Sequence, residues 1–137
     1  MQLDFNIDKS IYLQIAEQIE DSILQNVLEE ESQAPSTNQL AALYRINPAT
    51  AGKGINILVD SGVLYKRRGI GMFVATGARD QIRKKRKNMF YESFIQPLLN
   101  EASRLGIDPS ELCSMIMART GTPDQLPVKN DHRKGDA

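Results

Sequence analysis

Two helix-start signals stand close together near the middle of this chain, and they constrain the fold more than any other feature. Ser36 and Gln39 have the spacing of a capping box, which places the start of a short helix near Ser36. Asn47 followed by Pro48 is a second start, because asparagine caps a first turn and proline fits the first helical position. Only about three residues separate the two helices, and so short a turn makes them cross steeply, as in a helix-turn-helix.

A longer helix precedes this pair and a β-hairpin follows it. Isoleucines at every fourth position from Ile11 to Ile23 predict an amphipathic helix that packs its apolar face into a core. The stretch VLYKRRGIGMFV, residues 63–74, has two short apolar runs around a glycine-containing turn, which is typical of a hairpin. Three helices and then a hairpin is the order of a winged helix-turn-helix, in which the third helix enters the major groove and the hairpin is the wing. The expected fold class is α+β, mostly α.

The charges of the chain are segregated, although they sum to zero. Residues 1–43 hold one lysine against eight carboxylates, residues 44–87 hold eleven cations against two carboxylates, and residues 88–137 hold five cations against seven. A basic block of this kind is an electrostatic footprint for phosphate, whatever the total charge. Composition alone leaves an ordinary solvated surface open as the alternative.

Three adjacent cations, Lys66, Arg67 and Arg68, occupy the predicted tip of the hairpin, where they repel one another. Duplex DNA would neutralise them, because it carries about one phosphate charge per 1.7 Å of axis. Gly69 would let the wing backbone approach the duplex where a Cβ atom would collide. We expect these four residues to contact DNA; a solvated turn is the alternative.

Other polar residues are weaker candidates for the same role. Lys53 is the only cation of the third helix, and we expect it to contact DNA. Ser36, Thr37 and Asn38 would offer hydroxyl and backbone N–H groups to a phosphate, or they serve only to cap the helix. The basic run over residues 83–87 either reaches the flank of the duplex or forms a solvated helix face.

The C-terminal part is expected to be helical from about Ala78 to Gly106, with a last helix opened by Asp108. Pro97 cannot donate a backbone hydrogen bond and crowds the carbonyl four residues earlier, so a kink or break is expected near Ser93. These helices carry more apolar side chains than a short helical hairpin buries on itself. We therefore expect a dimer interface over residues 79–120, with candidate residues Phe90, Phe94, Leu98 and Leu112.

The expected organisation is a winged helix-turn-helix over residues 1–77, a helical dimerisation segment over 78–120 and a disordered tail over 121–137. About 45 ordered C-terminal residues can hardly enclose a ligand pocket of several hundred Å³ alone, so a small-molecule effector would bind at the dimer or interdomain interface. The aromatic residues Phe90, Tyr91 and Phe94 are expected to belong to a dimer or interdomain core rather than to a ligand cage.

Enzymatic and membrane functions find no support in the sequence. The chain has one histidine, His132, and one cysteine, Cys113, so no metal-ligand spacing and no nucleophile–base pair can be assembled. We expect no catalysis, no metal and no cofactor. No apolar run has the length of a membrane span, and the start MQLDFNIDKS lacks the features of a signal peptide. The single cysteine fits a reducing cytoplasm.

The segments IYLQIAEQI, PST with LAALY, NPATAGK and LYKRRGIGMFV resemble the DNA-binding half of GntR-type bacterial transcription regulators. The short C-terminal half resembles the YtrA-type subfamily, and the similarity covers about residues 9–120. Thr50 and Lys53 match the DNA-facing pattern of the family, and Pro48 lies in the matching helix start. Asn38 stands where the family usually has arginine. Gly52 and Gly54 are also atypical: either their helix is loosely held, or bare backbone is wanted near the groove.

The resemblance implies a homodimeric repressor that binds a two-fold symmetric operator and often controls a transporter operon. The alternative is a winged-helix protein-interaction module, whose wing would dock on an acidic partner. Salt would weaken both kinds of binding. Competition between duplexes of different sequence would separate them, because only a DNA reader discriminates among operators.

Overall fold

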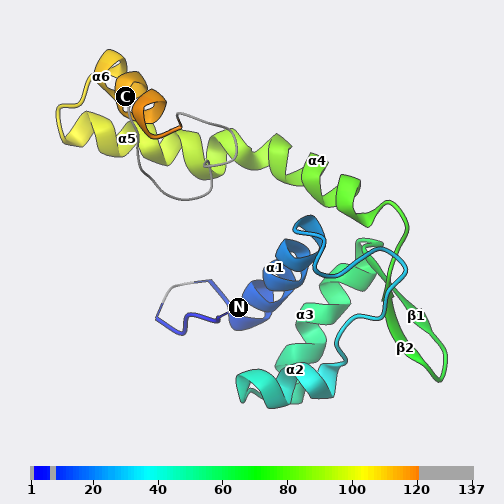
Figure 1. Cartoon of the computed structure of the whole chain (residues 1–137). Coiled ribbons are helices and arrows are strands. Elements are labelled where there is room, and N and C mark those ends of the chain that lie inside the picture. The colour runs from blue at the N-terminus through cyan, green and yellow to red at the C-terminus, as the bar shows by residue number, and fades with distance from the viewer. Residues whose placement is uncertain (1, 7–8, 121–137) are drawn as a thin grey trace. The chain divides into compact units, whose positions relative to one another are not determined.

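Three helices build the core of the N-terminal half of the chain (Figure 1). The computed structural model describes residues 2–6 and 9–120. These helices are α1 (Ile11–Leu24), α2 (Thr37–Tyr44) and α3 (Pro48–Asp60). The predicted isoleucine stripe of α1 faces inward. Together with apolar side chains of the other helices and of the hairpin, it forms a core that includes Ile15, Ile19, Ile23, Leu40, Ile55, Leu58, Leu64 and Val74.

Both predicted helix starts are present and cap as expected. The Ser36 hydroxyl accepts a hydrogen bond from the Gln39 backbone N–H at 3.0 Å, and the Ser36 N–H donates to Gln39 Oε1 at 2.9 Å. The Asn47 side chain accepts from the Ala49 N–H at 2.8 Å, with Pro48 at the first position of α3. Between them, Arg45 ends α2 in a left-handed conformation with φ of 56°. The winged helix-turn-helix prediction is therefore confirmed at its central turn.

The hairpin consists of β1 (Leu64–Arg67) and β2 (Gly71–Val74), which pair antiparallel with Leu64 opposite Val74. A four-residue turn closes it, because the Ile70 N–H donates to the Arg67 carbonyl at 2.9 Å. Gly69 has a φ of 77° at the third turn position, where a type II turn requires a positive φ. The backbone of the turn itself therefore favours glycine.

The segment between α1 and α2 runs along the other edge of β2. The Glu31 N–H donates to the Val74 carbonyl at 2.7 Å, and the Ala34 N–H donates to the Met72 carbonyl at 2.8 Å. Gln33 forms a single bridge with Phe73, and its side-chain amide donates to the Ile70 carbonyl at 3.0 Å. The wing is thus supported from one side almost to its tip.

The two unusual glycines of α3 have different surroundings. A Cβ atom on Gly54 would lie 2.8 Å from the Tyr12 carbonyl oxygen and 3.0 Å from Ile15 Cγ2, so glycine lets α3 approach α1 closely. A Cβ atom on Gly52 would be 3.6 Å from Thr37 Cγ2, which is ordinary contact. Close packing against α1 therefore accounts for Gly54, and neither of the two explanations considered from the sequence is needed there.

The first part of the next helix, α4 (Ala78–Phe90), packs with the N-terminal half, since Ala78 and Ile82 are fully buried in its core. By their contacts, residues 1–88 form one compact unit, and a second unit begins at Met89. This division lies later in the chain than the boundary expected after residue 77. The tail expected over 121–137 lies outside the described residues.

The second unit contains a π-helical turn, Tyr91–Ile95, followed by α5 (Gln96–Arg104) and α6 (Pro109–Arg119). The π-turn ends two residues before Pro97 and includes Ser93, so the irregularity predicted near Ser93 is present as a local widening of the helix. The Asp108 side chain caps α6 by accepting from the Glu111 N–H at 2.8 Å.

Candidate nucleic-acid interface

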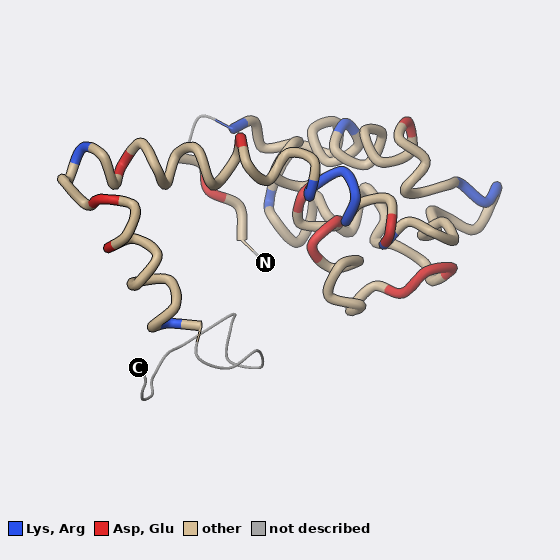
Figure 2. Tube along the Cα trace, turned by 90° about the horizontal axis from the view of Figure 1, so that it is seen from above, with Lys and Arg blue, Asp and Glu red and all other residues tan. Residues whose placement is uncertain are grey.

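The tip of the wing carries three exposed cations, which appear as the blue stretch at the right-hand end of the tube in Figure 2. The Arg67 guanidinium lies over the Phe73 ring, 4.6 Å from its centre, so this side chain is anchored on the hairpin. Lys66 and Arg68 have no ion-pair partner among the described residues. Their charges are therefore available to an external anion.

An acidic segment fixes the base of the wing. The Glu31 carboxylate accepts hydrogen bonds from the Thr76 hydroxyl at 2.6 Å, from the Thr76 N–H at 3.1 Å and from the Tyr65 hydroxyl at 2.5 Å. The bonds from Thr76 and Tyr65 lower the pKa of Glu31. Glu30 accepts from the N–H groups of Gly77 and Arg79, and these bonds lower its pKa as well. These bonds therefore hold the base of the hairpin, and the Gln33 amide holds it near the tip.

The outer face of α3 is formed by residues one helical turn or two apart. Ala49, Lys53 and Asn56 are exposed on it, and Pro48 is exposed at its start, whereas Thr50 is half-buried to one side. The Lys53 ammonium lies 4.2 Å from the centre of the Tyr12 ring on α1. A groove-reading helix would thus present Lys53 directly and Thr50 only partly.

The start of α2 already uses its capping groups. The Ser36 hydroxyl accepts the capping hydrogen bond, Thr37 is half-buried beside Gly52, and Asn38 is exposed. Capping is therefore observed, and a phosphate contact by Ser36, Thr37 or Asn38 stays a prediction.

Two exposed residues near this surface were not among the sequence candidates. Asn56 follows Lys53 by three positions and so shares its helix face; helical spacing alone would have found it. Arg45 lies in the turn between α2 and α3, in a left-handed conformation that no local sequence signal predicts for arginine.

Three of the five cations in the basic run over residues 83–87 form ion pairs within the chain. Lys85 and Arg86 pair with carboxylates of α1, and Arg83 pairs with Asp80 at 3.0 Å. In Figure 1, this part of α4 lies at the upper end of the first unit, whereas α2 and the tip of the wing lie toward its lower end. Lys85 and Arg86 therefore do not form a purely solvated face, and a contact of the run with the flank of a duplex stays a prediction.

A metal site, a membrane-spanning helix and a pocket are three further features that the part of the chain described by the structure could contain. That part contains no group of three or more His, Cys, Asp and Glu side chains able to hold a metal ion. None of its helices is long and apolar enough to cross a membrane. An apolar groove of about 260 Å³ lies between α1, α2 and the segment joining them, with Val27, Leu43 and Tyr44 in its lining.

The fold and this surface define a winged-helix DNA-binding regulator. Residues 11–74 match the family described as bacterial regulatory proteins of the gntR family. The chain is 29% identical over 122 residues to the HTH-type transcriptional regulator YhcF of Bacillus subtilis, covering 88% of this chain and 98% of that protein. It is 26% identical over 116 residues to the HTH-type transcriptional repressor YtrA of the same organism, covering 85% and 88%.

A solved structure of a GntR-family transcriptional regulator from Bacteroides thetaiotaomicron is 37% identical, with a TM-score of 0.60, and the match covers 77% of this chain and 91% of that one. The chain therefore belongs to the GntR family of regulators and to its short YtrA-type subfamily. These relatives are transcription regulators and not enzymes, which agrees with the expectation from the sequence.

Proposed function

We propose that this protein is a homodimeric repressor that binds a two-fold symmetric operator. The observation that carries the proposal is the wing, which holds exposed Lys66 and Arg68 at its tip and is tied down by Glu31 and Gln33. Cations on a supported hairpin suit a phosphate backbone, because the chain that carries them loses little conformational freedom on binding. Base edges would then be read from α3, by Lys53 and Thr50.

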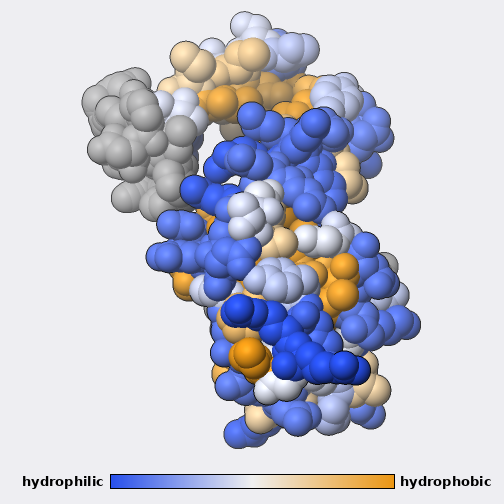
Figure 3. Space-filling view, turned by 90° about the vertical axis from the view of Figure 1, so that its right-hand side faces the viewer, coloured by the Kyte–Doolittle hydropathy of each residue, from blue (hydrophilic) through white to orange (hydrophobic). Residues whose placement is uncertain are grey.

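The second unit supports the homodimer part of the proposal. Its helices leave many large apolar side chains exposed, and apolar atoms gather on this unit in the upper part of Figure 3. Large apolar side chains left exposed in such number normally mark an interaction site. Phe90 and Phe94 stack at 5.5 Å between ring centres and are both exposed, whereas Leu112 is only 8% exposed and already packs within the unit. The surface includes Met89, Phe90, Tyr91, Phe94, Leu98, Leu99, Met115 and Ile116.

Selection of bound duplexes from a random pool with the full chain tests the DNA-binding part. A two-fold symmetric consensus is the expected result, because a homodimer presents two identical α3 helices. An absence of any consensus, together with tight salt-sensitive binding to an acidic protein, would replace the proposal by the protein-interaction alternative.

Sedimentation of the full chain and of a chain ending at Asn88 tests the dimer. This end point keeps Ile82 and Arg86, which complete the first unit. The full chain is expected to be dimeric at micromolar concentration and the shortened chain monomeric. A shortened chain that still dimerises would place the interface in the first unit instead.

A further inference from the structure

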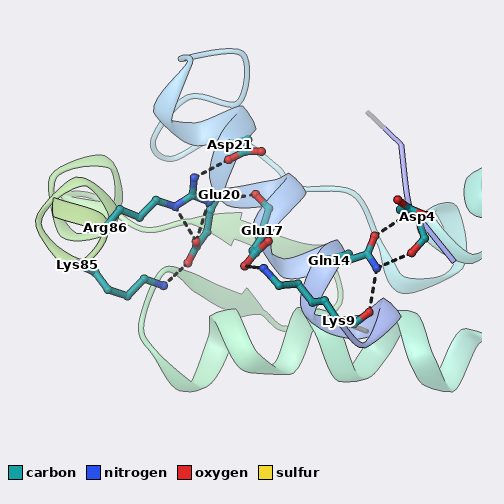
Figure 4. A network of polar contacts seen from close by, with 8 residues as sticks. All are labelled: Asp4, Lys9, Gln14, Glu17, Glu20, Asp21, Lys85 and Arg86. Carbon is teal, nitrogen blue, oxygen red and sulfur yellow. Dashed lines mark hydrogen bonds and ion pairs between the residues drawn. The ribbon is translucent and has the colours of Figure 1, made fainter. Parts of the chain in front are cut away.

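A buried carboxylate on α1 holds two cations of α4. The Glu20 side chain is 5% exposed, and Lys85 Nζ lies 2.5 Å from its Oε2. Arg86 contacts Glu20 Oε1 through Nη2 at 3.0 Å and through Nε at 3.3 Å. The same guanidinium reaches Asp21 Oδ1 at 2.6 Å and the Glu17 carbonyl at 3.3 Å (Figure 4).

This network differs from an ordinary surface ion pair. A carboxylate taken out of water is costly unless it is paired and hydrogen-bonded, and Glu20 receives three such contacts, all from α4. Partial burial opposes the charged form of Arg86, yet the hydrogen bonds to Asp21 and Glu20 raise its pKa, so the guanidinium stays charged. Removal of these partners would leave a buried charge without compensation.

Further contacts fix the beginning of α4 against the same unit. Arg79 Nε donates to the Leu24 carbonyl at 3.1 Å, at the end of α1. Ile82 is fully buried one turn later, and Lys85 and Arg86 follow after another turn. The anchors thus span about two helical turns, which is enough to prevent α4 from pivoting on α1.

We propose that Glu20 is a positioning residue that sets the direction in which α4 leaves the DNA-binding unit, and thereby the half-site spacing that the dimer accepts. The inference rests on the proposed function. The π-turn and α5 follow α4 without a loop, so the course of α4 is the route by which two DNA-binding units would be joined. Under this proposal, a clamped α4 restricts the separation and the relative rotation of the two α3 helices, and a released α4 restricts them less.

The test compares four proteins on operators that differ only in spacing. They are the wild type, Glu20→Gln, Arg86→Lys and the control Glu17→Gln. Arg86→Lys keeps the charge but cannot contact Glu20 and Asp21 together. Glu17→Gln makes the same change as Glu20→Gln on the same helix, at a side chain that is 49% exposed and pairs with Lys9. The selected operator is used with its spacer unchanged, lengthened by about one or two base pairs, and lengthened by about half a helical turn of roughly 5 base pairs.

The wild type and Glu17→Gln are expected to lose at least about tenfold in affinity when the spacer is lengthened. Glu20→Gln and Arg86→Lys are expected to bind a single half-site within about threefold of the wild type, yet to tolerate the longer spacers within about threefold. A merely structural role would lower binding to every duplex alike. Thermal unfolding shows whether each variant is folded. If Glu20→Gln does not fold, the comparison is made with Arg86→Lys alone.

Two results overturn the inference while leaving the proposed function intact. One is that Glu20→Gln and Arg86→Lys lose affinity with spacer length as the wild type does. The other is that Glu17→Gln tolerates the longer spacers as well as Glu20→Gln and Arg86→Lys do. A monomeric full chain, or a selected site without two-fold symmetry, overturns the proposed function itself and the inference with it.

Discussion

The Lys53 ammonium on α3 lies over the Tyr12 ring on α1, 4.2 Å from its centre. The next residue, Gly54, brings the two helices together, because its missing side chain leaves room for the Tyr12 carbonyl. Helix α1 therefore takes part in presenting the outer face of α3. Tyr12, which lies outside the helix-turn-helix, would thus influence how α3 contacts a duplex.

Replacing Tyr12 by leucine is expected to weaken operator binding through Lys53. An exposed cation–π contact contributes about 0.5–1 kcal/mol, so the Tyr12→Leu and Lys53→Met effects on binding should be non-additive by about that amount. Tyr12→Phe keeps a ring and should bind as the wild type does. A double-mutant cycle of operator affinity measures the coupling, and strictly additive effects would show that Tyr12 does not position Lys53.

The same substitution at the two glycines of α3 is expected to have opposite effects on stability. Gly54→Ala should destabilise by about 1–3 kcal/mol, because the methyl group meets the α1 backbone and one helix must shift. Gly52→Ala should stabilise by about 0.5–1 kcal/mol, since alanine favours a helix interior and meets only ordinary contact there. Urea unfolding of both variants checks this. Equal signs would contradict the packing argument.

Replacing Arg68 by alanine is expected to weaken binding to operator and random duplex almost equally. A lost phosphate contact should reduce the slope of log affinity against log salt by about 0.9 in each subunit. Lys84→Ala removes an exposed cation of α4; it is the matched control and should leave the slope unchanged. Replacing Thr50 or Lys53 should instead reduce the difference in affinity between operator and random DNA. If the salt slope of Arg68→Ala is unaltered, Arg68 does not contact phosphate, and the tip of the wing faces solvent or a protein partner.

Gly69 is expected to be replaceable by asparagine but not by valine. Its φ of 77° is reached by asparagine with modest strain, whereas a β-branched side chain is strongly disfavoured there. A Cβ atom would meet nothing within 4 Å in the chain itself, so the penalty comes from the backbone and not from crowding. Amide hydrogen exchange of residues 64–74 should rise in Gly69→Val only. Similar exchange in both variants would assign the role of Gly69 to DNA approach alone.

The contribution of Glu31 to stability is expected to vanish in acid. Hydrogen bonds from Thr76 and Tyr65 hold the pKa of Glu31 below its ordinary value of 4.5 in the folded protein. Its contribution is therefore fully present above pH 4.5 and is lost as the pH falls through the lower, folded value. Glu31→Gln should lower the melting temperature at neutral pH, and its difference from the wild type should shrink below pH 4.5. Glu29→Gln is the control and should change the melting temperature at neutral pH less than Glu31→Gln, since Glu29 lacks the Thr76 and Tyr65 contacts of Glu31.

The elements of the first unit could be predicted because their signals are local. Ser36 and Asn47 act on backbone groups within a few residues, and the stripe of α1 needs only a helical period. The irregularity near Ser93, in the second unit, could be predicted in the same way from Pro97. The position of Lys66 and Arg68 at the tip needed only the hairpin register, which the turn fixes.

Contacts between distant parts of the chain could not be predicted in this way. The link of Glu20 to Arg86 spans α1 and α4, and nothing in either helix shows which cation of the run 83–87 would turn inward. The close approach at Gly54 depends on the crossing of α3 with α1, and the sequence shows only a costly glycine. Arg45 takes a left-handed conformation because the steep turn imposes it, against the preference of the residue itself.

The segment that runs along β2 also decides which strand edge of the hairpin is left open. With residues 31–34 on one side and β1 on the other, β2 is covered, and the open edge of the two-stranded sheet belongs to β1. Lys66 and Arg67 stand on that edge. Charged side chains discourage an exposed strand from pairing with the same strand of another molecule. The cluster that would hold phosphate would thus also protect concentrated protein from edge-to-edge aggregation while no DNA is bound.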